Sequence, residues 1–135
     1  MLDATEQAMN RSFLLITALG FARIAMAQSG VNTVKDISPQ ALSVLLPLVH
    51  VIDVNEADNY AYAHVPGATL LAYDAITADV LPADKSASLV FYCWSPECPA
   101  AGMAAETAAS LGFTNVSCMY AGITGWQDAG LATEP

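Results

Sequence analysis

The sequence is poor in basic residues, with 4 Lys and Arg against 13 Asp and Glu and a formal net charge of -9. Proteins that bind nucleic acid or anionic lipid use clustered positive charge, so we expect neither partner. Arginine is absent after Arg23, and the two lysines are Lys35 and Lys85. An anionic substrate must therefore be held mainly by backbone N–H groups and helix termini rather than by a guanidinium group.

The chain also lacks internal repeats, low-complexity tracts and an apolar run of the about 20 residues that a membrane-spanning helix needs. Its 135 residues are enough for one domain that buries its own hydrophobic core without metals or cross-links. We expect a single domain at residues 31–135 and no stable membrane insertion once the N-terminal segment has been processed.

Residues 1–27 have the layout of an export signal. Arg11 precedes an apolar run from Phe13 to Ala22, and an Ala-x-Ala triplet ends at Ala27. This order predicts a secretory signal peptide that is cut after Ala27, and hence an exported protein, periplasmic if the source is bacterial. Arg23 interrupts the apolar stretch, so the alternative is an N-terminal helix of a cytoplasmic protein.

Predicted strands and helices alternate along the rest of the chain. Runs rich in apolar and β-branched residues predict strands at 48–54, 69–72, 88–93 and 115–120. Helical segments are predicted from Pro39, at 56–62, at 74–81, from Pro99 to just before Gly112, and at 122–130. This alternation indicates an α/β fold with a mainly parallel sheet covered on both faces, in which ligands bind outside the carboxyl ends of the strands.

Two cysteines stand where the strand at 88–93 ends and a helix is about to begin, in the stretch "FYCWSPECPAAG". If the loop turns its N–H groups inward and the helix directs its positive end at Cys93, the thiolate is stabilised and its pKa falls. Cys93 is then a nucleophile in a small anion-binding cup. A disulfide between Cys93 and Cys98 is the alternative, because a short loop can bring the two sulfurs together.

The third cysteine, Cys118, lies inside the apolar strand "VSCM", where we expect a buried and inert thiol. A zinc site at Cys93 and Cys98 would need two further ligands, and the candidates His50, His64 and Cys118 show no paired spacing. We therefore expect no metal.

From about Val34 to its end, the chain resembles the rhodanese family. The matching stretches are, in order, "ISPQAL", "VIDVNEADNYAYAHVPGA", "LVFYC" and "NVSCMYAGITGWQDAGL". Their common order and separation make the resemblance more specific than any single motif. It implies a rhodanese-like three-layer α/β domain, with a mainly parallel central sheet flanked by helices.

The resemblance also implies a site. In that family the cysteine after this strand takes a sulfane sulfur from a donor, holds it as a persulfide and passes it to a thiol acceptor; by position this residue is Cys93. The loop that would cradle the persulfide consists of Trp94, Ser95, Pro96, Glu97 and Cys98. The implied partners are a small sulfur donor and a thiol acceptor, or a thiol of a partner protein, and no cofactor is expected.

Four other positions bear on this site. Asp53 and His64 match family positions, and we expect them to be structural, Asp53 by ordering a loop and His64 by fixing a turn. Asn55 stands where the family commonly has an arginine, and Glu97 adds a negative charge beside the proposed cup. Since that charge opposes anion binding and thiolate formation, we expect thiosulfate to be a poor donor.

Three functions follow as alternatives. The first is a sulfurtransferase that carries persulfide sulfur on Cys93. The second is a thiol–disulfide redox module in which Cys98 attacks an oxidised or persulfidated Cys93. The third is a non-catalytic domain that uses Trp94 and the cup to bind a ligand or partner.

Overall fold

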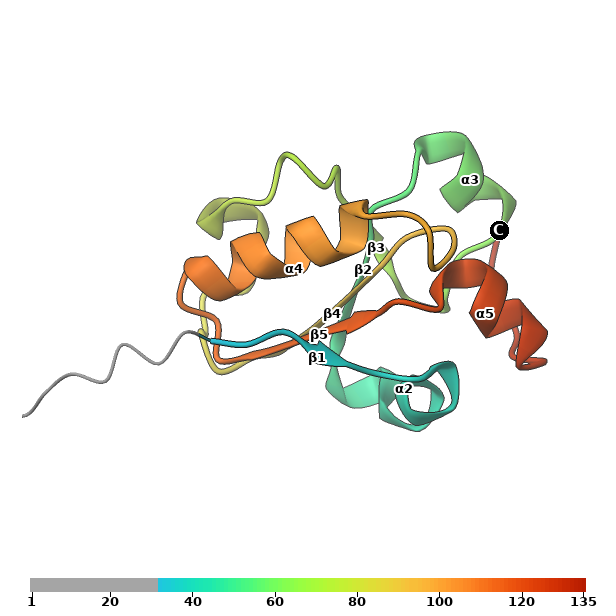
Figure 1. Cartoon of the computed structure of the whole chain (residues 1–135), viewed down its shortest axis with the longest axis horizontal. Helices are drawn as coiled ribbons and strands as arrows, with labels where there is room; N and C mark the ends of the chain where they lie inside the picture. The colour runs from blue at the N-terminus through green and yellow to red at the C-terminus, as the bar shows by residue number, and fades with distance from the viewer. Residues whose placement is uncertain (1–31) are drawn as a thin grey trace, which may run out of the picture. The chain divides into compact units, whose positions relative to one another are not determined.

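A five-stranded sheet, in which every pair of neighbouring strands is parallel, forms the centre of the domain (Figure 1). The structure is a computed structural model that describes residues 32–135. The export segment predicted at residues 1–27 lies outside the described residues. In spatial order the strands are β1 (Lys35–Asp36), β5 (Asn115–Met119), β4 (Ser88–Tyr92), β2 (His50–Asp53) and β3 (Thr69–Leu70).

Helical segments cover both faces of the sheet (Figure 1). One face carries α4 (Ala100–Ser110) and the 3-10 turn η2 (Ala78–Val80); the other carries α2 (Pro39–Leu45), the 3-10 turn η1 (Leu46–Leu48) and α5 (Gly122–Asp128). The short helix α3 (Ala57–Tyr62) follows β2. This arrangement confirms the predicted three-layer α/β architecture. Within residues 32–135, none of the helices has both the length and the apolar character of a membrane span.

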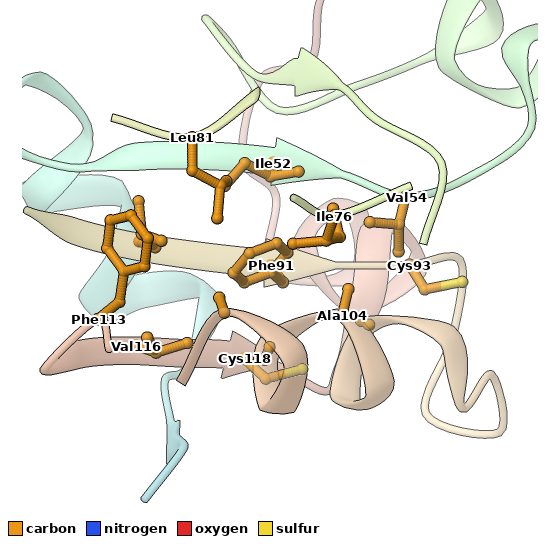
Figure 2. Close-up of a cluster of buried hydrophobic side chains, with 14 residues drawn as sticks. Ile52, Val54, Ile76, Leu81, Phe91, Cys93, Ala104, Phe113, Val116 and Cys118 are labelled. Atoms are coloured by element: carbon orange, nitrogen blue, oxygen red, sulfur yellow. The ribbon is translucent and has the colours of Figure 1, made fainter. Parts of the chain in front are cut away.

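Alternate side chains of β4 enter two separate cores, because successive residues of a strand point to opposite faces. Leu89 and Phe91 join the cluster beneath α4, which Figure 2 shows together with Phe113. Val90 and Tyr92 join the cluster beneath α2 and α5. Burial of each large apolar side chain of this kind contributes about 1.5–3 kcal/mol, so side chains on both faces of β4 stabilise the strand that directly precedes Cys93.

Helix α4 lies close to the sheet because its buried face is made of alanines, which are Ala101, Ala104, Ala105 and Ala108. The helix ends at Ser110, two residues before Gly112 and close to the end that the sequence predicts. Gly112 has a φ of +100°, and its N–H bonds the carbonyl of Ala109 while that of Phe113 bonds the carbonyl of Ala108. This pairing of the last carbonyls ends the helix, and glycine takes the left-handed conformation at low cost.

The helix predicted at 74–81 is wrong. The segment contains a 3-10 turn at Ala78–Val80, preceded by Thr77 in an extended conformation. Ile76 and Leu81 are both buried in the core beneath α4, and the extended residue between them lets both side chains reach it. Tertiary packing therefore outweighs the local helical pattern. The two-residue strand β1 was not predicted, because a strand this short shows no periodicity.

Candidate functional site

Cys93 follows β4 at the carboxyl edge of the sheet and is 5% exposed (Figure 2). It forms a disulfide with Cys98, and the Cα atoms of the two residues are 6.3 Å apart. The pairing that the sequence left open is therefore present in this structure. A sulfur held on Cys93 lies within reach of a Cys98 thiol.

The loop after Cys93 is fastened to the start of α5. The carbonyls of Cys93 and Trp94 accept hydrogen bonds of 3.0 Å from the N–H groups of Ile123 and Thr124. All described peptide bonds are trans, so the N–H that follows each of these carbonyls points away from α5. The N–H groups concerned are those of Trp94 and Ser95, the first amides of the predicted cradle.

Hydrogen bonding leaves several amides of this loop available. The Cys98 N–H closes a turn on the carbonyl of Ser95, at 3.1 Å. In the described part of the chain, no hydrogen bond uses the N–H groups of Trp94, Ser95 or Glu97. Pro96 has no N–H to offer. The loop therefore supplies three donors that an anionic sulfur could engage.

Helix α4 begins directly after this loop, with Pro99 in the N-cap position. The N–H groups of its first turn have no partners within the helix and carry the positive end of its dipole. The structure thus has the strand, loop and helix order that the sequence indicates for a stabilised thiolate.

Gly122 brings the loop and α5 into contact. Its φ is +69°, and a Cβ at this position would lie 2.6 Å from the backbone N of Ser95 and from the backbone C and O of Trp94. A Cβ essentially never lies this close to backbone atoms. The loop can therefore adopt its observed conformation only with glycine at position 122.

Positive side chains do not approach the loop in the described residues. Lys35 lies on β1, two strands away from β4, and the ammonium of Lys85 lies 4.3 Å from the ring centroid of Phe113. Glu97 is exposed. Among residues 32–135, the groups near the loop that could hold an anion are therefore uncharged donors.

A buried polar chain lies behind the cysteine. The Tyr92 hydroxyl donates to Oδ2 of Asp53 at 2.6 Å and accepts from the N–H of Val65 at 3.0 Å, while Oδ1 of Asp53 accepts the Asn55 N–H at 2.7 Å. Burial raises the pKa of Asp53, and the hydrogen bonds from Tyr92 and Asn55 oppose this rise. Burial and the adjacent Asp53 raise the pKa of Tyr92 well above its usual range. Asp53 thus orders the chain after β2, in the role the sequence analysis assigned to it.

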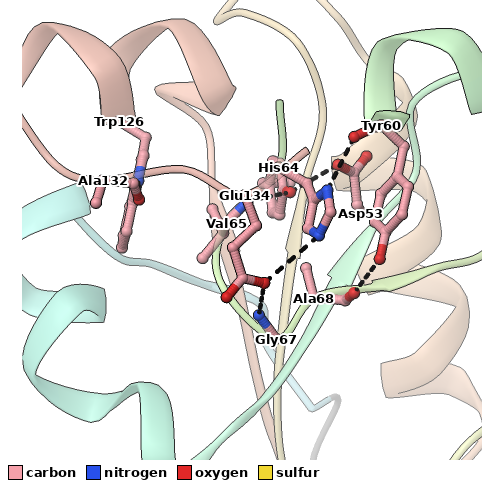
Figure 3. A network of polar contacts seen from close by, with 10 residues as sticks. Asp53, Tyr60, His64, Val65, Gly67, Ala68, Trp126, Ala132 and Glu134 are labelled. Carbon is pink, nitrogen blue, oxygen red and sulfur yellow. Dashed lines mark hydrogen bonds and ion pairs between the residues drawn. The ribbon is translucent and has the colours of Figure 1, made fainter. Parts of the chain in front are cut away.

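His64 belongs to a second polar cluster (Figure 3). Its Nδ1 lies 2.8 Å from the carbonyl of Tyr60, its ring stacks on the Tyr60 ring at a centroid distance of 3.8 Å, and its Nε2 lies 3.7 Å from Oε2 of Glu134. Glu134 also accepts the N–H of Gly67 at 3.2 Å. His64 therefore fixes the turn after α3 to the C-terminal segment, as a structural residue does.

Cys118 is fully buried on β5. Burial, with a smaller contribution from Asp36, raises the pKa of its thiol to about 12. Within residues 32–135, no three His, Cys, Asp or Glu side chains come together in a group that could hold a metal ion.

The side chain of Asn55 was not foreseen as part of the site. Its Oδ1 lies 3.5 Å from Sγ of Cys93, although 38 residues separate the two in sequence. In the sequence, Asn55 stands out only as an uncharged residue where the family commonly has an arginine. The signal that could have located it is its place just after β2, the strand that pairs with β4.

Comparison with known proteins agrees with this geometry. A family model described as a rhodanese-like domain matches residues 38–129. The BH2092 protein of Bacillus halodurans superimposes with a TM-score of 0.67 and 22% identity, over 96% of this chain and 85% of that chain. The rhodanese-like domain of the Alr3790 protein of Anabaena gives a TM-score of 0.65 and 23% identity, over 76% and 80% of the two chains.

A thiosulfate sulfurtransferase of Pseudomonas aeruginosa gives a TM-score of 0.66 and 27% identity, over 77% of this chain but 20% of that chain. This chain therefore matches about a fifth of that protein's length. No match was found among curated proteins. From the family match over residues 38–129 and the shared fold, the chain belongs to the rhodanese-like domain family.

Proposed function

We propose that this domain is a sulfurtransferase that carries sulfane sulfur as a persulfide on Cys93. The observation that carries the proposal is the position of Cys93 in a rhodanese-like domain, at the end of β4 and at the head of a loop with three free amides. Oriented N–H groups stabilise charge that develops on a sulfur, and they need no cationic side chain to do so.

In the loading step the Cys93 thiolate attacks the sulfane sulfur of a donor. The sulfur–sulfur bond of the donor breaks, and its electron pair leaves with the remainder of the donor as sulfite or a thiolate. Cys93 then holds a persulfide whose outer sulfur is anionic. The free N–H groups of Trp94, Ser95 and Glu97 are the proposed partners of that charge.

The disulfide favours a second step that involves Cys98. A Cys98 thiolate attacks the Sγ of persulfidated Cys93, the outer sulfur leaves as hydrosulfide, and the Cys93–Cys98 disulfide forms. The sulfane sulfur is reduced as the two thiols are oxidised. A dithiol, small or on a partner protein, would return both cysteines to the reduced form.

Intact mass spectrometry tests this proposal. Reduced protein is incubated with inorganic polysulfide, with thiosulfate or with neither, and released sulfide is measured. We expect the wild type to lose the mass of two hydrogen atoms and release sulfide, Cys98→Ser to gain one sulfur atom, and Cys93→Ser to do neither. No mass change in the wild type or in Cys98→Ser with any donor would contradict catalysis and favour the binding domain.

The choice of donor follows from the charge of the loop. A dianion such as thiosulfate meets no cation among residues 32–135 and approaches Glu97, so we propose that low-molecular-weight persulfides, whose sulfur carries a single charge, are the preferred donors. Export of the protein after Ala27 stays a prediction, which N-terminal sequencing of the protein from its native cell would decide.

Glu97→Gln is expected to accelerate loading from thiosulfate. Because Glu97 is exposed, solvent screens its charge, and we expect a gain of only about two- to fivefold at low salt. The rate is measured from the mass of Cys98→Ser protein at intervals, and the gain should shrink as salt is added. Glu106→Gln, an equal charge change on the exposed side of α4, is the control. Equal rates for all three proteins at low salt would refute the electrostatic argument.

A further inference from the structure

The side-chain amide of Asn55 is held beside the sulfur of Cys93 from the neighbouring strand. Asn55 follows β2, which pairs with β4, so both residues lie at the carboxyl edge of the sheet. The Asn55 backbone N–H donates to Oδ1 of Asp53 at 2.7 Å, which fixes the residue. Its Oδ1 then lies 3.5 Å from Sγ of Cys93.

When Cys93 is in the disulfide, the oxygen and the nitrogen of the Asn55 side-chain amide both lack suitable hydrogen-bond partners. A disulfide sulfur carries no proton, so the Oδ1 of Asn55 faces another acceptor. The Nδ2 of Asn55 is buried and has no hydrogen-bond partner among the residues that the structure describes. In the disulfide form, therefore, neither the Nδ2 nor the Oδ1 of Asn55 has a suitable hydrogen-bond partner.

A half-turn of the amide exchanges its oxygen and nitrogen with almost no change in shape. An N–H of Asn55 then points at the sulfur. The half-turn gives up a longer contact between Nδ2 and the Asp53 carboxyl, one of several contacts that oppose the rise in the pKa of Asp53. Hydrogen bonds to an anion are shorter and stronger than those between neutral groups, so a negative sulfur favours the turned amide.

The orientation that suits the sulfur depends on its chemical state. A thiol donates its proton and matches Oδ1, whereas a thiolate or a persulfide anion only accepts and matches Nδ2. We propose that Asn55 is the side-chain donor that stabilises an anionic sulfur on Cys93, and that its amide turns over when the sulfur passes from thiol to anion. The persulfide part rests on the proposed function, but the effect on the thiolate does not.

Apart from His50, at the opposite end of β2, and the tyrosines, the other ionisable groups on the elements around Cys93 are acidic. They are Asp53 at the end of β2, Glu56 and Asp58 at the start of α3, Glu97 and Cys98 in the loop, and Glu106 on α4. None of them can donate to a thiolate as an anion. Among the uncharged side chains of the described residues, Asn55 is the one whose polar atom lies within hydrogen-bond range of Sγ of Cys93.

The acidity of Cys93 tests this inference in reduced Cys98→Ser protein. Alkylation rates at Cys93 are followed across pH by peptide mapping, in the parent and with Asn55→Leu or Asn55→Asp added. Leucine keeps the size without a donor, and we expect the pKa of the Cys93 thiol to rise by about one unit. Aspartate adds a like charge, and the rise should be larger. Asn59→Leu, an amide on α3 with no side-chain hydrogen bond among the described residues, should leave the profile unchanged.

A structural role alone would lower the melting temperature and leave the pH profile of alkylation where it is. Unchanged profiles in both Asn55 variants would therefore overturn the inference. If those variants do not fold, the ¹⁵N signal of the Asn55 side-chain amide in the Cys98→Ser parent gives the same answer. It should titrate together with Cys93, and a signal that does not change with pH overturns the inference.

The persulfide lifetime separates this inference from the proposed function. In Cys98→Ser protein loaded with polysulfide, Asn55→Leu should shorten the lifetime of the sulfur adduct about tenfold. An Asn55 effect on acidity without any sulfur adduct refutes sulfur transfer and leaves the role of Asn55 intact. Normal loading and lifetime with no Asn55 effect refutes the role of Asn55 and leaves sulfur transfer intact.

Discussion

Gly122→Ala is expected to slow sulfur loading of Cys93 by about 100-fold, because a displacement of the reacting group by about 1 Å has effects of that size. A Cβ on residue 122 would lie 2.6 Å from backbone atoms of Trp94 and Ser95. Backbone cannot rotate aside as a flexible side chain can. Either the loop moves away from α5, or the hydrogen bonds from Ile123 and Thr124 to its carbonyls are lost. In both cases the amides no longer point where the persulfide forms.

Gly130→Ala is the matched control for this prediction. Gly130 has a φ of +74°, close to the +69° of Gly122, but a Cβ added to it would meet nothing within 4 Å. Both variants place alanine in the left-handed conformation, at a cost of about 1–2 kcal/mol of stability. The clash should raise the cost of Gly122→Ala to about 3 kcal/mol or more.

Each variant is made in the Cys98→Ser background. Chemical denaturation then measures its stability, and mass spectrometry measures the rate of sulfur loading on Cys93. Gly130→Ala should load at nearly the parental rate despite its lower stability. If the two glycine variants load equally fast, the close contact at Gly122 does not shape the loop.

Tyr92→Phe is expected to lower the free energy of unfolding by about 3 kcal/mol, since two buried groups lose their partner at once. The Val65 N–H loses its acceptor, and Oδ2 of Asp53 loses its donor. Tyr60→Phe is the control, because it removes one hydroxyl that donates to the Ala68 carbonyl without touching Asp53. We expect this control to cost about 1 kcal/mol.

The loss in Tyr92→Phe should also depend on pH. Burial raises the pKa of Asp53 in the fold above its unfolded value near 3.8, so the folded protein binds this proton more tightly. Stability from this group is present below the unfolded pKa and is lost as pH rises through the folded pKa. The Tyr92 hydrogen bond opposes the rise in the pKa of Asp53, so its removal raises that pKa further and extends the loss to higher pH.

The difference in unfolding free energy between wild type and Tyr92→Phe should therefore grow as pH rises above the folded pKa of Asp53 in the wild type, whereas that of Tyr60→Phe stays constant. Urea denaturation at several pH values measures both differences. A loss in Tyr92→Phe that is the same at every pH would show that Asp53 does not titrate through this hydrogen bond.

Interactions between residues close in sequence were predictable, and tertiary contacts were not. Ser38 accepts the N–H of Ala41 at 3.1 Å and Pro39 starts α2, as the cap pattern predicts. The predicted helix at 74–81 was wrong because burial of Ile76 and Leu81 required an extended residue between them. Local patterns succeed where the interaction that they describe lies within a few residues.

The sequence by itself determined the alternation of strands and helices, the family, the place of Cys93 at a strand end and the lack of cations for an anionic ligand. Each of these depends on composition, periodicity or short motifs. The tertiary structure alone decided that Asn55 lies against the sulfur, that Tyr92 partners Asp53 and that Gly122 holds the loop. The first two contacts join residues 38 and 39 positions apart, and the third joins α5 to the loop after β4. The reason is that strand order and register, which no local pattern encodes, determine which residues meet at the carboxyl edge of a parallel sheet.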